Sequence, residues 1–426
     1  MPPIEDHPLR YDLANELHAR PFPFIDAPAT AVYLAIKPEH DAAKRDRAAD
    51  MAHLIDLLDR HGAAHPQPGA THYFGQIGKH NLKWESHTEF VTYTVFTDQV
   101  SSRAFDPADF EVFPADWLGR APGKRITSAL IRITPWTSKE DLRVHLNDWF
   151  VSESVAVARV LDDAAVMAGD FRVDPAGHLR FALSVGPGTG QSRTGRIVQR
   201  ICEIETYKTM SMLGFARVRE MGAGMGALDD RLNRLTSSLA GGGKAPDQAL
   251  EELLTISAEL EGMVAQSAFR LSATIAYEKI VNQRIEILRE ERFDGRQTFG
   301  EFMMRRYQPA MRTVLSVKER LEAMSARAGR TAQLLRTRVD VERSAQNQAL
   351  LESMDKRADL QLRLQKTVEG LSVVAISYYA VSLASYVLYP LAEPLAITKG
   401  MLMAIVTLPI VVAVWALVRR IRQKVD

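Results

Sequence analysis

The sequence predicts an α+β protein in which a mixed α/β domain precedes a long helical stalk and two transmembrane helices. Strand-like and helix-like patterns alternate early in the chain, strand signals disappear after Arg193, and two uncharged apolar stretches lie near the C-terminus. These observations favour four segments. They are a cytosolic mixed α/β domain at 1–190, a long-helix stalk domain at 191–370, a transmembrane hairpin at 371–418 and a basic tail at 419–426.

The first segment is expected to form one mixed sheet with helical cover. Polar or proline-containing boundaries and apolar periodicity predict helices from Asp6 to just before Pro21, over Asp41–Arg60 and over Ser138–Phe150. Met51, Leu54, Ile55 and Leu58 are expected on one face of the second helix. Runs of β-branched and aromatic residues predict the strands. The expected strands are Ala31–Lys37, Phe90–Phe96, Ala129–Ile133 and Ser154–Leu161, with a hairpin formed by Asp170–Val173 and Leu179–Val185.

The second segment is expected to be entirely helical. Arg196–Leu239 has a helical pattern interrupted around Gly222–Gly226, and a glycine-rich break follows at 241–246. Asp247 is expected to cap a helix that reaches Arg292. After a turn at Phe293–Gln297, a third helical region is expected over Phe299–Glu369, with a kink at Pro309. This region has neither glycine nor proline between Arg330 and Glu369, so it should continue unbroken into the first transmembrane helix.

The apolar stretches Leu371–Tyr389 and Gly400–Val418 contain no charged residue. Each is about nineteen residues long, which as a helix spans roughly 28 Å, close to the hydrocarbon thickness of a bilayer. The intervening loop is short, so the two form a hairpin. Basic residues follow the second stretch and few lie in the loop, which predicts cytoplasmic N- and C-termini. Because the chain begins without a basic and apolar leader, no cleavable signal peptide is expected.

An uncharged seam runs along the stalk and into the first transmembrane stretch in steps of three and four residues. Charged residues occupy the other faces, as in a helix that packs against other helices. One interpretation is packing against the second stretch or a neighbouring copy. The alternative is a pore in which several copies turn hydroxyl groups toward a shared axis. The candidate residues of this stripe are Gln361, Gln365, Ser372, Tyr379, Ser382, Tyr386 and Tyr389, and Leu351 and Met354 precede them on the seam.

Composition excludes several classes of protein. A net charge of +1 gives no overall basic field for nucleic acid. The single cysteine, Cys202, excludes a disulfide framework and is expected in the core. We expect no metal site or cofactor, because Gly62 and Pro66 break any helix joining the nearby histidines. Those histidines are His61, His65, His72, His80 and His87. Ser-His-Asp and Cys-His arrangements are not discernible, so the protein is not expected to be an enzyme.

Three further clusters could serve either a ligand or chemistry, or only the fold. Asn15, Glu16, His18 and Arg20 form either a pocket for an anionic ligand or a structural helix end. The glycine-rich run 186–196 either cradles a phosphate or serves as a hinge, and it lacks the lysine and Ser/Thr of a Walker loop. Glu203 and Glu205 are two residues apart on a helix and therefore point to different faces. A salt-bridged helix surface is the favoured interpretation of that pair.

Four long stretches resemble a bacterial family of uncharacterised membrane-anchored proteins, a domain of unknown function. They are HPLRYDLANELHARPF (7–22), EIETYKTM (203–210), LLRTRVDVERSAQNQALL (334–351) and LQLRLQKTVEGLSVVAISYY (360–379). This resemblance implies a membrane anchor. The overall layout is also similar to that of CorA-type magnesium channels, which implies a homo-oligomer. Where those channels carry Gly-Met-Asn, this chain has Tyr386-Val-Leu-Tyr-Pro390.

Together these patterns predict a non-enzymatic, homo-oligomeric protein of the bacterial inner membrane. The lipid bilayer and further copies of the chain are the expected partners, and nucleic acid is not. One hypothesis is a CorA-like protein that conducts or regulates a cation flux. The alternative is a membrane-tethered module that binds a ligand or acts as a scaffold, without transport.

Overall fold

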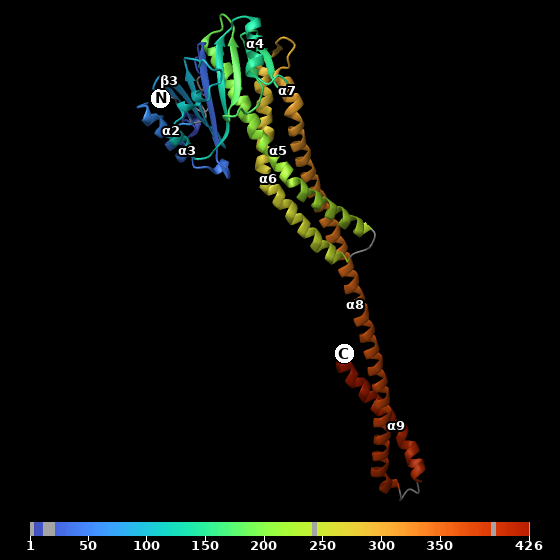
Figure 1. Cartoon of the computed structure of the whole chain (residues 1–426). Coiled ribbons are helices and arrows are strands. Elements are labelled where there is room, and N and C mark those ends of the chain that lie inside the picture. Colours follow the sequence, from blue (N-terminus) through green and yellow to red (C-terminus); the bar gives the residue numbers. More distant parts are fainter. Residues whose placement is uncertain (1–3, 12–21, 241–244, 393–397, 426) are drawn as a thin grey trace. The chain divides into compact units, whose positions relative to one another are not determined.

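The structure is a computed structural model that describes residues 4–11, 22–240, 245–392 and 398–425 (Figure 1). The chain divides into two compact units. Met1–Gly243 and Glu251–Thr331 form the first, and Lys244–Leu250 and Ala332–Asp426 form the second. We call them the sheet unit and the hairpin unit and describe each by itself.

Within the described residues, the sheet unit is built on a nine-stranded sheet in the order β2-β3-β4-β1-β5-β8-β7-β6-β9. Neighbouring strands are antiparallel except β5 and β8, which pair in parallel from Ala129↔Leu179 to Pro135↔Val185. The strands are β1 Ala29–Lys37, β2 His72–Ile77, β3 His80–Ser86, β4 Val91–Thr97, β5 Lys124–Pro135, β6 Ala156–Val160, β7 Ala165–Gly169, β8 Leu179–Val185 and β9 Glu291–Arg292.

Helices complete both units. They are α2 Arg47–Arg60, α3 Ala115–Gly119, α4 Lys139–Trp149, α5 Gln191–Ala240, α6 Pro246–Leu288, α7 Phe299–Arg306, α8 Gln308–Ala392 and α9 Lys399–Val425, with 3-10 turns at Ala42–Lys44 and Pro107–Val112. The helices α6 and α8 contribute residues to both units.

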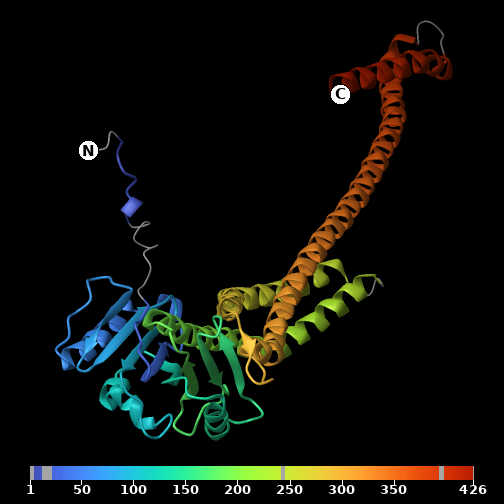
Figure 2. The ribbon, with the colours of Figure 1, turned by 90° about the horizontal axis from the view of Figure 1, so that it is seen from above.

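The two faces of the sheet carry separate hydrophobic layers, because successive side chains of a strand point to opposite faces. On one face, Leu34 and Trp84 pack with Leu54 of α2, Trp117 of α3 and Leu146 of α4. On the other face, strand residues pack against α5, α6 and α7. This second layer includes Tyr33, Ile131, Phe181, Ile201, Leu271 and Phe299. The helix α5 lies across β1 and β5 (Figure 2).

Several predicted elements are confirmed. The strands expected at Ala31–Lys37, Phe90–Phe96, Ala129–Ile133, Ser154–Leu161 and Leu179–Val185 correspond to β1, β4, β5, β6 and β8. The predicted helix at Ser138–Phe150 is α4. It begins where expected because the Ser138 hydroxyl accepts a hydrogen bond from the Asp141 amide at 3.0 Å.

Other expectations for the α/β segment are wrong. The helix expected from Asp41 begins at Arg47, where Asp46 caps it, and its buried apolar face is Leu54, Leu57 and Leu58. Met51 and Ile55 are only half-buried. The strand preceding β8 is Ala165–Gly169 rather than 170–173, because the buried Asp170 ends it by accepting the amides of Val151 and Arg172. The strands β2 and β3 were not anticipated, since polar residues obscure their alternation.

The helical segment also differs in detail. The helix α5 continues through 222–226 without a break, and α6 ends at Leu288 rather than Arg292. Pro246 is the first residue of α6, so Asp247 lies in the first turn instead of capping it. The helical region expected over Phe299–Glu369 is divided at Tyr307, which ends α7, and Pro309 lies just after this break in the first turn of α8, where proline fits.

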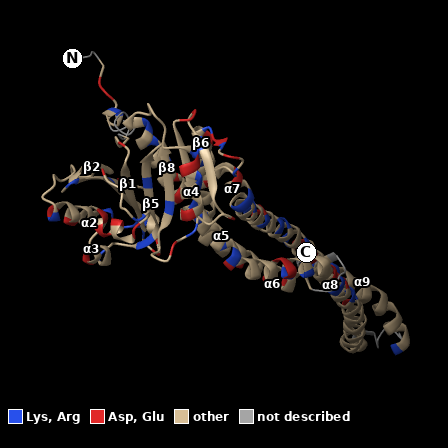
Figure 3. Ribbon diagram, turned by 45° about the horizontal axis from the view of Figure 1, so that its top comes forward, with Lys and Arg blue, Asp and Glu red and all other residues tan. Residues whose placement is uncertain are grey.

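The hairpin unit consists chiefly of the C-terminal part of α8 and of α9. As predicted, α8 is unbroken from the stalk into the first apolar stretch. In the described residues, α8 and α9 are the two helices that are long and apolar enough to cross a membrane. Figure 3 shows few charged residues over the paired ends of these helices.

Candidate functional site

The two apolar helices of the hairpin unit contact each other through serines of α8. Ser377 and Ser385 are each 5% exposed, and Leu402 and Val414 of α9 are buried as well. A cavity of about 440 Å³ lies between the helices. Its lining residues with hydroxyl groups are Ser377, Tyr378, Ser382 and Thr407, and the remaining lining is mainly valine. The face of α8 that meets α9 is therefore centred on Ser377 and Ser385.

The stripe predicted from the sequence lies mostly outside this contact. Tyr379 is 66% exposed and Tyr386 is 72% exposed, and Ser372 and Tyr389 are exposed as well. Ser382 is half-buried at the cavity. The hydroxyls of Ser372 and Ser382 donate to the carbonyls four residues earlier, at 2.8 and 2.9 Å. In a single chain, Tyr379 and Tyr386 are thus largely exposed, although the Tyr386 ring lies 5.8 Å from Lys399 Nζ at the start of α9.

The stalk part of the seam is exposed too. Every residue from 340 to 368 of α8 is exposed, including Gln361 and Gln365. Leu351 is 65% exposed and Met354 is 58% exposed. A helix of this length that presents large apolar side chains to water has an unused packing face.

The candidate ligand residues Asn15, Glu16, His18 and Arg20 lie outside the described residues. The five histidines of the early stretch are divided among α2's C-terminal end, β2, β3 and the turns beside them. His65 Nε2 lies 2.6 Å from Asp59 Oδ1. Within the described ranges, no group of three or more His, Cys, Asp or Glu could hold a metal ion.

The glycine-rich run begins directly after β8. The Gly186 amide donates to the Ala164 carbonyl at 2.8 Å, and the Thr189 hydroxyl donates to the same carbonyl at 2.8 Å. A Cβ on Gly186 would lie 2.9 Å from the Asp163 carbonyl oxygen, so this close approach requires glycine. Gly186 and Pro187 line a cavity of about 450 Å³ beside the C-terminal ends of β5 and β8.

Glu203 and Glu205 both form ion pairs, as predicted. Glu203 pairs with Arg284 of α6 and accepts from Gln199 Nε2 at 2.8 Å. Glu205, however, is 1% exposed, so the expectation of a surface position is wrong for it. Its partners are Lys208 at 2.6 Å, Thr209 at 2.9 Å and Thr127 of β5 at 3.2 Å. Packing of α5 on the sheet buries this face of the helix.

Cys202 is buried in the core, as expected. Burial is the main cause that raises the pKa of its thiol well above the usual value. The thiolate is the reactive form of cysteine, so this environment makes Cys202 a packing residue and not a nucleophile.

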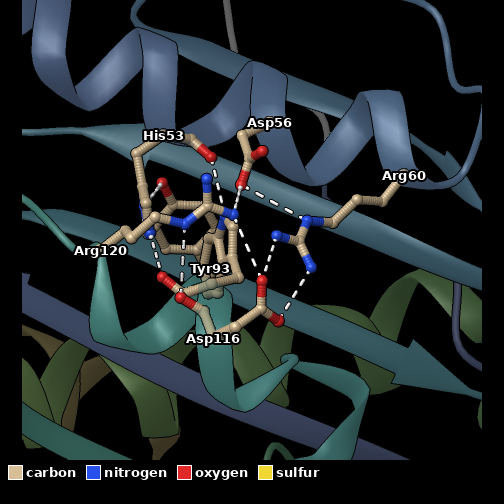
Figure 4. A network of polar contacts seen from close by, with 7 residues as sticks. His53, Asp56, Arg60, Tyr93, Asp116 and Arg120 are labelled. Atoms are coloured by element: carbon tan, nitrogen blue, oxygen red, sulfur yellow. Dashed lines mark hydrogen bonds and ion pairs between the residues drawn. The ribbon is translucent and has the colours of Figure 1, made fainter.

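A polar network between α2, α3 and the sheet was not anticipated (Figure 4). His53 Nδ1 lies 2.9 Å from Tyr93 Oη, and His53 Nε2 lies 3.1 Å from the Trp117 carbonyl. Trp117 Nε1 donates to the His53 carbonyl at 2.9 Å. Burial lowers the pKa of His53 and raises that of Tyr93. The position of His53 beside Leu54 and Leu57 is the sequence signal that could have revealed a buried histidine.

Ion pairs close the exposed side of the same network. Arg60 pairs with Asp116 at 2.6 Å, and Arg120 pairs with Asp56 at 3.0 Å (Figure 4). Each ring nitrogen of His53 has a partner, so the network fixes α3 to α2 and leaves the imidazole no position for a substrate.

Residues 5–425 match the family described as "Protein of unknown function (DUF3422)". The chain belongs to this family. The match covers nearly the whole length, so the sheet unit and both apolar helices of this DUF3422 chain lie within the family's boundaries. It confirms the predicted membership of a family without an assigned function. No curated protein and no solved structure matches this DUF3422 chain.

Proposed function

We propose that this DUF3422 protein is an integral protein of the bacterial inner membrane that self-associates along α8 and holds its sheet unit at the cytoplasmic surface as a non-enzymatic binding or scaffolding module. One observation carries the proposal: the uncharged seam of α8 is exposed along the stalk and into the apolar stretch of a single chain.

The membrane part of the proposal is supported by the exposed surfaces of the hairpin. Leu383, Val387, Leu408 and Leu417 are each more than half exposed. Such a surface is unfavourable in water and is compatible with lipid, where a helix also satisfies its own backbone hydrogen bonds. The basic residues after Val418 favour a cytoplasmic C-terminus, and a hairpin places the stalk on the same side.

The self-association part is supported by the stalk. Burying a leucine or methionine side chain contributes about 1.5–3 kcal/mol relative to leaving it exposed. A second copy in the same register would offer Leu351 and Met354 the same two apolar side chains of an identical uncharged seam, as in a parallel coiled coil. In the bilayer, the phenolic groups of Tyr379 and Tyr386 favour a neighbour that can form hydrogen bonds with them.

Two leucines of the stalk provide a matched test. Leu351 lies on the seam and is 65% exposed, whereas Leu360 lies on an outer face of the same helix and is 64% exposed. We expect Leu351→Asp to lower the oligomeric mass of the detergent-solubilised full-length protein, and Leu360→Asp to leave it unchanged. Light scattering coupled to size-exclusion chromatography measures both. A monomeric wild type, or equal effects of the two substitutions, would contradict self-association along this seam.

A CorA-like cation path is a second candidate function, favoured by the hydroxyl groups of the exposed stripe. If the stripe lines a path, Tyr379→Leu with Ser382→Leu abolishes cation flux into liposomes and leaves the oligomer intact. Flux that the substitutions do not change, or no flux with the wild type, favours the tethered module instead.

A further inference from the structure

The cavity beside Gly186 lies at a distinctive place in the sheet. The strands β5 and β8 are parallel and end together, where the Trp136 amide donates to the Val185 carbonyl at 2.8 Å. The cavity is lined by Trp136, which follows β5, and by Gly186 and Pro187, which follow β8. It therefore lies outside the carboxyl ends of two parallel strands.

The chain leaves these two ends toward opposite faces of the sheet. After β5 it enters α4, whose Leu142 and Leu146 pack in the same layer as α2 and α3. After β8 it enters α5, whose Ile197 and Ile201 pack in the opposite layer. In α/β sheets, the divergence of two connections opens a crevice at this point, and ligands bind there. The volume of about 450 Å³ is in the range of small-molecule sites.

Cationic side chains reach the cavity from three separate elements: Lys139 from α4, Arg159 from β6 and Arg292 from β9, which also pairs with Glu301. The acidic lining residues are Asp163 and Asp294. Asp294 is already neutralised, because Lys139 lies 2.9 Å away and Arg143 forms a second ion pair with it. Hydrogen bonds from Arg143 and then Lys139 hold the pKa of Asp294 well below its usual value.

Arg159 has an unused donor at this cavity. Its Nη2 donates to Glu291 at 3.0 Å. Its Nε is buried and has no hydrogen-bond acceptor within the described part of the chain. Asp163 Oδ1 lies 3.4 Å from that Nε, close enough for an ion pair but without the geometry of a hydrogen bond. A buried donor without an acceptor is unfavourable by about 1–3 kcal/mol. Because the Arg159 side chain as a whole is 42% exposed, a small shift can present this donor to an acceptor oxygen on a ligand in the cavity.

Aromatic side chains form another part of the lining. Trp136 is half-buried and meets the buried Phe293 edge to face, with ring centroids 6.2 Å apart. The indole is thus held in position beside the cavity, and a rigid aromatic wall of this kind favours a planar ring. The cations favour an anionic group on the ligand and the indole favours a planar ring, so the expected ligand carries both.

We propose that this cavity binds a small anionic ligand that carries a planar ring, the chemistry of a nucleoside monophosphate. Trp136 contacts the ring, and Arg159, assisted by Lys139 and Arg292, binds the anionic oxygens. The proposal concerns the sheet unit alone and does not depend on membrane insertion or self-association.

Isothermal titration of the full-length, detergent-solubilised protein with adenosine monophosphate tests the proposal. Adenosine and inorganic phosphate serve as probes of the two parts. We expect the monophosphate to bind more tightly than either part, and Arg159→Gln to weaken it at least about tenfold, the effect of losing one charged hydrogen bond. Arg120→Gln is the matched control, because Arg120 is also a partly exposed arginine with two carboxylate partners away from the cavity.

Two further variants separate loss of the ring contact from loss of the fold. Trp136→Phe keeps an aromatic ring and should retain most of the affinity, whereas Trp136→Ala should reduce it to that of inorganic phosphate. The thermal unfolding midpoint of each variant is measured in parallel. Absence of monophosphate binding to the wild type, or equal affinities of the wild type and Arg159→Gln, would overturn the assignment.

Discussion

Tyr277 on α6 donates a hydrogen bond of 2.8 Å to Glu89, which is completely buried in the turn between β3 and β4. Arg270, two turns earlier on α6, forms an ion pair with the same carboxylate. Burial, followed by the charge of Glu89, raises the pKa of Tyr277 well above its usual value, so the phenol remains a donor. The turn is thereby fixed to α6, because the buried Glu89 carboxylate accepts hydrogen bonds from both Tyr277 and Arg270.

Removal of one partner of this buried pair is predicted to be costly. Arg270→Ala leaves the Glu89 carboxylate buried without its cation, which we expect to lower the free energy of unfolding of the sheet unit by about 3 kcal/mol. Urea denaturation of the full-length protein, followed by tryptophan fluorescence, measures the change. The control is Arg217→Ala, whose ion pair with the exposed Glu220 should contribute under about 1 kcal/mol. Equal midpoints for the two variants would show that Glu89 is not held as described.

Replacement by alanine is expected to have opposite effects on stability at two glycines of α5. A Cβ at Gly214 would lie 2.1 Å from the Thr274 side chain of α6, whereas a Cβ at Gly222 would have no atom within 4 Å. Gly214→Ala should therefore destabilise the α5–α6 contact, by about 1–3 kcal/mol. Gly222→Ala should stabilise by up to about 1 kcal/mol, because alanine favours a helix more than glycine does. Thermal unfolding midpoints that shift in the same direction would contradict the close approach at Gly214.

The pH dependence of stability should depend on His53. Burial lowers its pKa in the folded protein below the unfolded value of 6.5, despite the hydrogen bond to the Trp117 carbonyl. Below pH 6.5 the unfolded chain binds a proton at His53 more readily than the folded protein does. The free energy of unfolding therefore falls as the pH decreases from 6.5 toward the pKa of His53 in the folded protein. One such group contributes at most about 1.4 kcal/mol per pH unit.

Replacement of the imidazole tests this linkage. We expect His53→Gln to be less stable than the wild type at neutral pH and to lose less stability on acidification to about pH 5.5. Urea midpoints of both proteins at several pH values give the two slopes. Parallel pH profiles would mean that His53 does not titrate differently in the two states.

The proposed orientation of the hairpin predicts which cysteines react in intact cells. Thr398→Cys, beside the loop, should react with a membrane-impermeant maleimide added outside spheroplasts. Arg420→Cys, after the second apolar helix, should react only after lysis. Cys202→Ser provides the background, and because Cys202 is buried it should add little labelling of its own. Reaction of Arg420→Cys alone before lysis would indicate the reverse orientation. Reaction of both variants before lysis would exclude the proposed orientation.

Local patterns in the sequence were sufficient for the elements whose residues interact mainly with near neighbours. Ser138 marks the start of α4, the Val–Thr–Tyr alternation marks β4, and the uninterrupted helix formers of the stalk predict the continuity of α8. The two apolar stretches could likewise be recognised from their length and their lack of charged residues. Among the site residues, spacing alone placed the stripe on one face of α8. Only the structure showed that most of its side chains are exposed in a single chain.

The sequence by itself determined that an α/β segment precedes the long helices, that two apolar helices lie near the C-terminus, and that the chain belongs to its family. Tertiary structure decided what depends on partners distant in sequence. Glu205 is buried because α5 packs on the sheet, and α5 continues past Gly222 although local propensity favours a break. The cavity with Trp136, Arg159 and Gly186 exists because β5 and β8 pair in parallel. Pairing of distant strands is set by the fit of whole faces, and that fit is not encoded in the spacing of neighbouring residues.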